Sequence, residues 1–358
     1  MLKRAGALLL VCASLGLGVG CSNTSTSRYL YAALPGGGAG EIVEYREDPN
    51  SGALTQLVSS PITAGAGVQA LAVHPSKKYL YAANSGSGNV SLFTISSSGD
   101  LNEVTPRANA GIGPSLLAMD PSGAYLYVAN SGSFDLTIFS IDSSTGVLST
   151  LVSSYPIGMN AINMALAPSG NFLYLTGAGN PGFIEAFSLS QGHPTIVQGT
   201  PFQTGKTPFG LAIDPGGKFL YTANSEPDNS ISEFTINSDG SLTQLANSPV
   251  GESYSSPVAL LVDKSGKYLY VANQGSSNLA GYSIGSDGSI TLLASSPFGT
   301  GAQPSFIAPD PSGNYLFVGS QGTSGTIQSF SLSSSSGTLT SVSTYNAGST
   351  PTSIVLTP

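Results

Sequence analysis

The sequence is poor in charge, in cysteine and in histidine, and each shortage excludes a class of function. Only 8% of the 358 residues are charged, and Lys and Arg together number 11 against 19 Asp and Glu. A nucleic-acid interface needs a basic stripe, so these scattered cations exclude nucleic acid as a partner. The two histidines and two cysteines lack the paired spacing of a zinc site. We therefore expect neither a metal nor a cofactor.

Both cysteines lie near the N-terminus, where the sequence has the pattern of a secretory leader. Lys3 and Arg4 form a short positive region, and an apolar stretch rich in Leu, Val and small residues follows. This order is typical of a signal peptide, which we assign to residues 1–20. If the leader is cleaved and Cys21 is acylated, the mature protein has no free thiol and no disulfide, so core packing alone must stabilise it.

The segment Gly18–Cys21 resembles a bacterial lipoprotein box, in which the cysteine becomes the acylated first residue. The fit is imperfect, because Leu17 stands one place earlier than the leucine of that box. The alternatives are an ordinary cleaved signal or an anchoring helix, with Cys21 incidental. We predict lipidation at Cys21, with residues 21–27 as a flexible tether. The protein is then held outside the cytoplasm, in the periplasm or on the cell surface, by an acyl anchor alone.

No stretch has the 3.6-residue periodicity or the capping pattern of a helix. Instead, an aromatic-Leu-aromatic triplet recurs seven times, at intervals of 46 to 50 residues. The triplets are centred at Leu30, Leu80, Leu126, Leu173, Leu220, Leu269 and Leu316. A fixed period of this length indicates a repeat architecture. Residues 28–358 are therefore expected to form one repeat domain.

Each repeat contains four apolar segments separated by turns. In the third repeat we place strands over 115–119, 125–129, 136–141 and 147–152, with Asp-Pro-Ser-Gly at the first turn. The second strand is apolar on both faces, whereas a strand in a sheet with one solvent-exposed face would alternate polar and apolar residues. The pattern predicts an all-β fold: a seven-bladed β-propeller with four antiparallel strands per blade.

Aromatic residues recur at three positions of the repeat, two in the triplet and one in the third strand. We expect them to fill the spaces between blades. They are Tyr29, Tyr79, Tyr125, Phe172, Phe219, Tyr268 and Tyr315; Tyr31, Tyr81, Tyr127, Tyr174, Tyr221, Tyr270 and Phe317; and Tyr45, Phe93, Phe139, Phe187, Phe234, Tyr282 and Phe330. Proline recurs in or after the fourth strand, which predicts that this strand is the outer edge.

The two ends of the repeat region complement one another. Residues 28–31 begin directly with a second strand, so the first repeat lacks an inner strand. The last segment, 351–358, matches the inner strand of the other repeats, for example 208–215. We therefore predict that the C-terminal strand pairs into blade one and closes the ring.

Two segments carry a family resemblance, Pro114–Asn130 (PSLLAMDPSGAYLYVAN) and Pro257–Asn273 (PVALLVDKSGKYLYVAN). With the following N-x-(V/I)-x-x-F-x-I and G-x-L-T phrases, they resemble the seven-bladed lactonase family, which includes bacterial 6-phosphogluconolactonase and shades into the YVTN-repeat surface proteins. The resemblance covers 28–358. It implies a propeller whose active site, with His, Arg and acidic residues, lies at the mouth of the central channel.

The sequence departs from that family where its chemistry is expected. The inner-strand position at which the family carries histidine is occupied by Gln69, Ser115, Ile162, Phe209, Val258, Ser305 and Thr352. Opening a lactone needs a general base or a metal, together with groups that hold the developing oxyanion. His74 stands in a turn that carries Asp elsewhere, and His193 lies in an outer hairpin. We therefore expect that the protein is not an enzyme.

The loops around the expected channel mouth vary between repeats, and this variation marks the candidate site residues. The only charged group that could serve a hydrolase comprises Lys206, Glu226, Asp228 and Glu252. The candidate ligand-binding residues are Gln69, Asn130, Asn163, Phe209, Tyr254 and Gln303. The alternative is plain loop variation. A neutral, aromatic-dotted mouth suits a small carbohydrate-like or peptide ligand, or another surface protein.

These observations favour an extracytoplasmic lactonase-like propeller that acts mainly as a binding or surface-interaction scaffold, as a monomer, with its ligand at the channel mouth. The alternative is a lactone or carboxylic ester hydrolase, similar to 6-phosphogluconolactonase, that uses the charged group above. Scarce cations argue against a phosphorylated substrate, because little in the chain could hold its phosphate.

Overall fold

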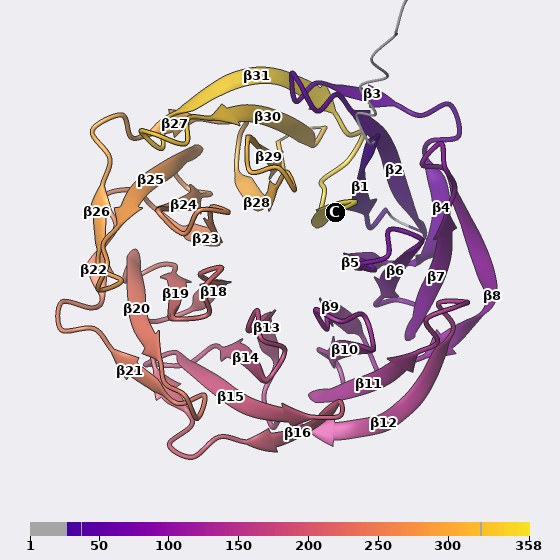
Figure 1. Ribbon diagram of the computed structural model, residues 1–358, viewed down its shortest axis with the longest axis horizontal. Helices are drawn as coiled ribbons and strands as arrows, with labels where there is room; N and C mark the ends of the chain where they lie inside the picture. Colours follow the sequence, from indigo (N-terminus) through magenta and orange to yellow (C-terminus); the bar gives the residue numbers. More distant parts are fainter. Residues whose placement is uncertain (1–26, 37, 323) are drawn as a thin grey trace, which may run out of the picture.

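The computed structural model describes residues 27–36, 38–322 and 324–358, and it forms a closed ring of seven sheets (Figure 1). The predicted seven-bladed β-propeller is confirmed. The predicted signal peptide, Cys21 and all but the last residue of the predicted tether lie outside the described residues.

Each blade takes consecutive strands, except that blade 1 also takes the last one. The strands are, in blade 1, β1 (Arg28–Leu34), β2 (Ala39–Glu47), β3 (Leu54–Gln56), β4 (Ile62–Ala66) and β32 (Ser353–Leu356); in blade 2, β5 (Val68–Val73), β6 (Tyr79–Asn84), β7 (Asn89–Ile95) and β8 (Leu101–Asn109); in blade 3, β9 (Pro114–Met119), β10 (Tyr125–Asn130), β11 (Asp135–Ile141) and β12 (Leu148–Pro156); in blade 4, β13 (Ala161–Leu166), β14 (Phe172–Gly177), β15 (Phe183–Ser190), β16 (His193–Ile196) and β17 (Phe202–Gln203); in blade 5, β18 (Pro208–Ile213), β19 (Phe219–Asn224), β20 (Ser230–Ile236), β21 (Leu242–Gln244) and β22 (Val250–Gly251); in blade 6, β23 (Pro257–Val262), β24 (Tyr268–Asn273), β25 (Asn278–Ile284), β26 (Ile290–Leu292) and β27 (Phe298–Gly299); and in blade 7, β28 (Pro304–Pro309), β29 (Tyr315–Ser320), β30 (Thr326–Leu332) and β31 (Leu339–Asn346).

The outermost strand of a blade is continuous in blades 2, 3 and 7 and is split in two in the other four. At each split a proline stands between the two halves: Pro61, Pro201, Pro249 and Pro297. A proline has no N–H to donate to the ladder, and an edge strand tolerates this because one of its sides has no partner strand. The outer position predicted for the fourth strand is thus confirmed.

The seams between blades hold the repeated aromatic residues. All of them are buried except Tyr125 and Phe172, which are half-buried. Together with aliphatic residues of the second and third strands they form seven apolar clusters, each built from two neighbouring blades. Because both faces of each sheet are covered in this way, most of the chain is committed to the scaffold.

A tyrosine of the second strand also joins neighbouring blades by a hydrogen bond. In blade 5, the Tyr221 hydroxyl donates to the carbonyl oxygen of Gly288 in blade 6 at 2.8 Å. The same bond recurs from Tyr31, Tyr81, Tyr174 and Tyr270, each to a turn glycine of the next blade. The glycine is required twice over: Gly288 has φ +88°, and a Cβ there would lie 2.4 Å from a ring carbon of Phe219.

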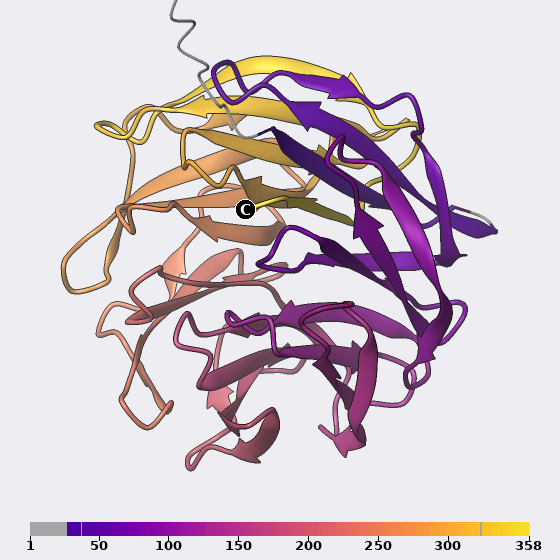
Figure 2. The ribbon, with the colours of Figure 1, turned by 45° about the vertical axis from the view of Figure 1, so that its right-hand side comes forward.

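The last strand closes the ring. Strand β32 pairs antiparallel with β1, with Leu356 opposite Leu30 and Ser353 opposite Ala33. The backbone N–H of Thr352 donates to the carbonyl of Ala33 at 3.0 Å, which extends the pairing towards the channel. The predicted closure is therefore confirmed, and Figure 2 shows β32 at the inner end of the first sheet.

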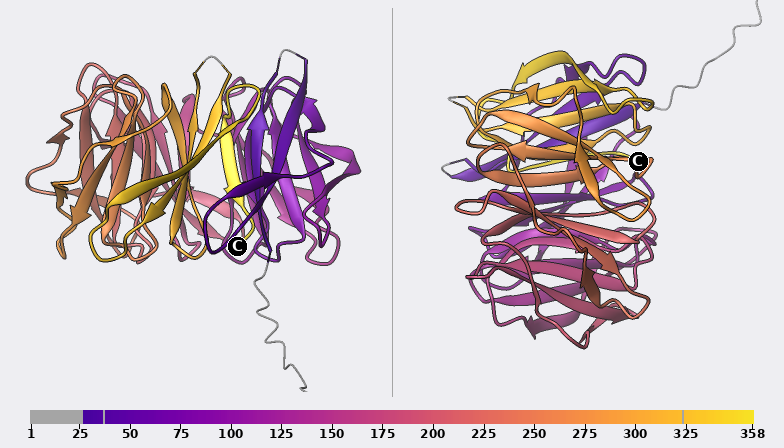
Figure 3. Two further views of the ribbon diagram at one scale, coloured as in Figure 1. Left: turned by 90° about the horizontal axis from the view of Figure 1, so that it is seen from above. Right: turned by 90° about the vertical axis from the view of Figure 1, so that its left-hand side faces the viewer.

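The seven inner strands run side by side around the axis, and their first residues lie at the same end of the ring. Because β1 and β32 meet antiparallel, the start of β1 and the end of β32 lie at the opposite end; Figure 3 shows the C-terminus at this lower face. We call the end where the inner strands begin the mouth. Over the described ranges, the structure contains no helix long and apolar enough to cross a membrane.

Candidate functional site

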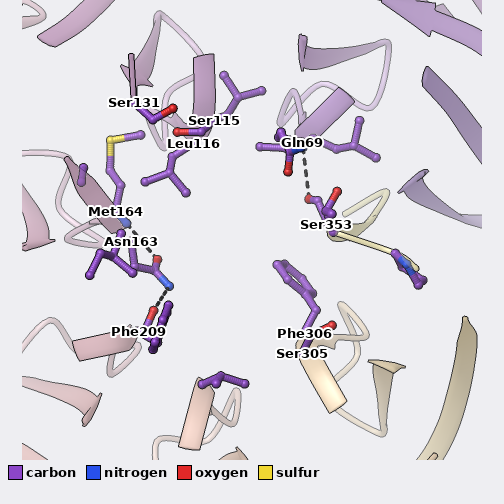
Figure 4. A pocket seen from close by; sticks show the side chains of 18 of the residues that line it. Gln69, Ser115, Leu116, Ser131, Asn163, Met164, Phe209, Ser305, Phe306 and Ser353 are labelled. Carbon is purple, nitrogen blue, oxygen red and sulfur yellow. Dashed lines mark hydrogen bonds between the residues drawn. The ribbon is translucent and has the colours of Figure 1, made fainter. Parts of the chain in front are cut away.

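A cavity of about 620 Å³ occupies the mouth of the central channel (Figure 4). Its walls are the first residues of the seven inner strands, with a few residues from the loops that follow the second strands, such as Ser131 and Gln321. One position from every blade reaches it: Gln69, Ser115, Ile162, Phe209, Val258, Ser305 and Thr352. We call these seven residues the mouth ring.

A β-bulge places six of the mouth ring residues. In blade 5, for example, Pro208 pairs with Asn224 and Gly210 with Ala223, so Phe209 is an extra residue with no partner on β19. The same shift occurs at the corresponding point of blades 2, 3, 4, 6 and 7. A bulge turns its extra side chain out of the regular alternation, so the fold directs these residues into the channel whatever their chemistry.

The mouth ring carries no ionisable side chain. The next position along each inner strand carries none either: Ala70, Leu116, Asn163, Gly210, Ala259, Phe306 and Ser353. Among the described residues that line the cavity there is no Asp, Glu, His, Lys or Arg. The centre of the propeller is therefore electrically neutral, and no group there could take a proton from water near neutral pH.

Aromatic and amide side chains give the cavity its character. The Asn163 side chain bridges blades 4 and 5, because its Nδ2 donates to the carbonyl of Phe209 at 2.9 Å while its Oδ1 accepts from the N–H of Met164 at 2.8 Å. The Phe306 ring points into the cavity from the opposite wall (Figure 4). Phe209 is 42% exposed, so much of its ring surface is open to a ligand.

The predicted charged group is divided into two places, and neither is the cavity. Lys206 and Asp228 pair with each other: Nζ lies 3.7 Å from Oδ1, and the backbone N–H of Lys206 donates to Oδ2 at 2.7 Å. Glu226 accepts a hydrogen bond from the hydroxyl of Ser256 at 3.3 Å. Among the described residues that line the cavity, none belongs to this predicted group. A catalytic role for these residues stays a prediction.

Glu252, the fourth member of the group, lies in the connection from β22 to β23. Burial raises its pKa to about 7, against the opposing effect of a hydrogen bond from Tyr282. The Tyr282 hydroxyl donates to Oε2 at 2.5 Å, and Oε1 is buried with no partner among the described residues. Glu252 thus titrates near neutrality, with its carboxylate directed at strand β25.

The predicted ligand-binding residues fall into four environments. Gln69, Asn163 and Phe209 line the cavity. Asn130 is 1% exposed, and its Nδ2 donates to Asp135 and Thr137 within blade 3.

The remaining two, Tyr254 and Gln303, lie outside the central cavity. Tyr254 packs against the apolar cluster between blades 5 and 6. Gln303 lines a separate hollow over blades 6 and 7. Only three of the six candidates are therefore brought together at the channel mouth.

The two histidines have structural surroundings. The N–H of Ser76 donates to His74 Nδ1 at 3.1 Å, so Nε2 carries the proton and donates to the carbonyl of Gly123 in the next blade at 3.0 Å. His193 is exposed at the start of β16. In the part of the chain that the structure describes, no group of three or more His, Cys, Asp or Glu could hold a metal ion.

The cavity includes further residues that were not among the candidates, notably Ser115, Ile162, Ser305, Phe306 and Thr352. The signal was available in the repeat itself. Each stands at or next to the inner-strand position that carries Gln69 and Phe209 in other blades, and equivalent positions of a propeller meet at the axis. The seven positions were compared only for a missing histidine; taken together as a lining, they include all of these residues except Phe306, which follows Ser305.

Comparison with known proteins identifies a family for the whole propeller. The sequence profile described as "Lactonase, 7-bladed beta-propeller" matches residues 22–116, 62–164, 160–255 and 228–356. No curated protein matches the sequence.

Solved structures share the fold at low identity. A putative 6-phosphogluconolactonase from Bacteroides uniformis is 18% identical with a TM-score of 0.77, covering 92% of this chain and 99% of that one. A second putative 6-phosphogluconolactonase, from Bacteroides fragilis, is 21% identical with a TM-score of 0.75 and coverages of 94% and 99%. The periplasmic gluconolactonase of Pseudomonas aeruginosa is 18% identical with a TM-score of 0.74 and coverages of 93% and 99%.

Proposed function

The chain belongs to the lactonase family of seven-bladed β-propellers, and on that premise we propose that it binds a small, uncharged, polyhydroxylated ligand at the channel mouth without hydrolysing it. One observation carries this proposal: all seven mouth ring positions, to which the fold directs a side chain, are occupied by residues that cannot ionise near neutrality. Hydrolysis of a lactone needs a base to activate water and a donor for the oxyanion, and the cavity offers no base.

The composition of the cavity supports a sugar-like ligand. The rings of Phe209 and Phe306 offer apolar faces on which the C–H face of a sugar can pack. The amide of Gln69 can both donate to and accept from hydroxyl groups. A phosphorylated ligand is disfavoured, because no Lys or Arg is among the described residues of the cavity walls.

The proposal includes a place of action outside the cytoplasm, with the chain held to a membrane through acylated Cys21. The leader sequence supports this part, through Lys3, Arg4 and the apolar stretch that follows. The start of β1 lies at the face opposite the mouth, so a tether leading to it leaves the cavity open to the surrounding medium.

Lactone hydrolysis is the second candidate function, and family membership favours it. The solved structures of similar fold include proteins titled as putative 6-phosphogluconolactonases and as a gluconolactonase. In this chain Lys206, Glu226, Asp228 and Glu252 are the charged residues that we consider for such a role. A hydrolase would have to move its substrate from the neutral cavity towards them.

The test measures binding and turnover on residues 27–358. We expect calorimetry to detect binding of neutral mono- and disaccharides such as glucose, N-acetylglucosamine and cellobiose, and we expect glucono-δ-lactone to be hydrolysed no faster than in buffer. Phe209→Ala should weaken saccharide binding about tenfold or more. The matched control is Val58→Ala, because that side chain is fully exposed and outside the cavity walls. Turnover that disappears in a Glu226→Gln/Asp228→Asn variant would replace the binding function with the hydrolase.

A further inference from the structure

A second hollow, of about 730 Å³, lies on the mouth side over the boundary between blades 6 and 7. It is lined by Ser256, Gln274, Gly275, Ser277, Ala302, Gln303 and Gly322. Gln321, which lines the central cavity, directly precedes Gly322, so the hollow begins where the cavity ends. A third hollow, of about 360 Å³, shares Ala302 and Gly322 and continues over blade 7. Together they form a track that leads outward from the channel mouth.

The boundary between blades 2 and 3 offers an internal comparison for this track. The equivalent hollow over blades 2 and 3 measures about 540 Å³. There the residue before the inner strand of blade 3 is Gly113, and the residue before the third strand of blade 2 is Gly88. Both glycines have the left-handed φ that this backbone requires, +68° and +67°. The track keeps the same backbone at Gln303, φ +57°, and Ser277, φ +53°, although non-glycine residues are strained there. Left-handed non-glycine residues also stand at equivalent positions of other blades, namely Phe134 in blade 3 and Thr207 and Asn229 in blade 5. The track is therefore distinguished by the side chains that it presents.

A second difference concerns the residue after the second strand. In blades 2 and 3 it is Ser85 or Ser131, whose hydroxyl donates to a loop carbonyl at 2.9 Å. In blades 6 and 7 it is Gln274 or Gln321; the backbone N–H keeps that bond, at 2.8 Å and 3.0 Å. Among the described residues, neither of these glutamine side-chain amides has a hydrogen-bond partner. The track therefore presents amide groups that the scaffold does not use.

We propose that the track binds the continuation of an uncharged oligosaccharide whose terminal unit lies in the central cavity. This inference rests on the function proposed above and extends it from a small ligand to a chain. The amides of Gln274 and Gln303 in the track, and that of Gln321 at the adjoining edge of the central cavity, can each donate to and accept from sugar hydroxyls. No charged side chain is among the described residues that line the two hollows of the track, so an acidic or basic polymer gains nothing there.

The test compares chain lengths by calorimetry on residues 27–358, with cellobiose to cellopentaose and N-acetylglucosamine to chitopentaose as probes. The informative variant gives the track the residues of blade 2: Gln274→Ser, Ser277→Gly and Gln303→Gly together. The two glycines relieve left-handed strain, while the variant loses the 3.3 Å hydrogen bond from the Gln303 N–H to the Ser277 hydroxyl, so the melting temperature should change little. We expect the wild type to bind a pentasaccharide at least tenfold more tightly than the disaccharide, and the variant to lose that gain while binding the disaccharide as before.

Each other outcome has a definite meaning. Equal affinity for short and long saccharides would overturn the proposed binding in the track and leave the cavity function intact. The same holds if the variant keeps the higher affinity for the pentasaccharide. Binding of long chains that is lost in the track variant but not in Phe209→Ala would overturn the cavity function and keep the track. A neutral Gly-Ser-Ala pentapeptide that binds with the same dependence would assign the track to peptides instead. Absence of saccharide binding throughout would overturn both.

Discussion

The seams between blades and the loops at the channel mouth are built from the same seven repeats, yet they vary to very different degrees. In the seams, the second aromatic of the triplet is Tyr in six blades and Phe in one, and its ring is buried every time. At the mouth, the seven residues of the mouth ring include an amide, hydroxyls, aliphatic groups and one aromatic side chain. Close packing restricts which residues can occupy the seams, whereas it does not restrict which residues stand in the mouth ring. The variation therefore locates the part of the propeller that is free to serve a ligand.

Removing the strand that closes the ring should have the largest effect. Deletion of 352–358 takes away β32, exposes the edge of β1 and uncovers the apolar cluster between blades 7 and 1. We expect the free energy of unfolding to fall by more than about 4 kcal/mol and the transition to lose cooperativity. Circular dichroism in urea measures both, with deletion of Pro358 alone as control. Equal melting temperatures for the truncated and full chains would contradict a closed ring.

Crowding one seam should have the next largest effect. In Gly288→Ala, the new methyl group meets the ring of Phe219 at 2.4 Å in a left-handed backbone. We expect a loss of about 2–4 kcal/mol, from overpacking together with backbone strain. Gly299→Ala is the matched control, because a Cβ there meets no atom within 4 Å. Comparable losses in the two variants, by urea unfolding, would show that the seam is not tightly packed.

Glu47 makes the closing seam sensitive to pH. Burial raises its pKa to about 8, nearby Asp310 adds to the effect, and Arg28 opposes it. Arg28 pairs with Asp310 at 2.7 Å, and its Nη1 lies 3.9 Å from Glu47. Because the folded pKa lies above the ordinary 4.5, the stabilising contribution of this group is complete below pH 4.5 and disappears as the pH rises through about 8.

We therefore expect the difference in stability between wild type and Glu47→Gln to change by about 1–3 kcal/mol between pH 5 and pH 8.5, with the wild type losing more on going to high pH. Glu41→Gln is the control, because Glu41 is an exposed residue of the same strand, β2. Melting curves across this pH range provide the measurement. Parallel curves for wild type and Glu47→Gln would mean that Glu47 is solvated.

Removing one hydroxyl from a seam should have a smaller effect. In Tyr221→Phe, the carbonyl of Gly288 loses its donor inside a buried cluster, and we expect a cost of about 1–2 kcal/mol. Blade 7 carries Phe317 at this position, so the ring itself fits. The Tyr254 hydroxyl has no hydrogen-bond partner among the described residues, so Tyr254→Phe should leave stability unchanged. If both variants unfold at the same urea concentration, the hydroxyl bond contributes nothing.

Changing a mouth residue should leave stability almost untouched. Phe209 is 42% exposed at a bulge, so Phe209→Ala is expected to change the free energy of unfolding by about 0.5 kcal/mol or less. The same substitution is expected to weaken saccharide binding, as described above. A large loss of stability would instead make Phe209 part of the scaffold and remove the contrast between seam and mouth.

The fold could be predicted from the sequence because its causes are local and repeated seven times. The triplets, the turn glycines and the unpaired first and last strands each follow from residues close together in the chain. The cavity could be predicted only in part. Phe209 and Gln69 were found by their chemistry, whereas Asn130 turned out to hold its own loop through Asp135 and Thr137. The neighbouring sequence does not distinguish an asparagine that caps a loop at the end of a strand from one that faces the channel.

Bulges explain most of what the sequence could not reveal. A strict alternation would point Ile162 and Val258 in directions set by their neighbours, and the extra residue changes those directions. Bulge positions depend on how two strands are paired, and the sequence of one strand does not contain that information.

The hydrogen bonds from Tyr31, Tyr81, Tyr174, Tyr221 and Tyr270 to the following blade have a consequence for local motion. An open array of repeats frays from its two ends, so its amide protons exchange fastest there and slowest at the centre. Here the bond from Tyr31 to blade 2 and the pairing of β1 with β32 leave no blade at an end. Amide protons of the second strands should therefore exchange at similar rates in all seven blades, through opening of the whole circle at once.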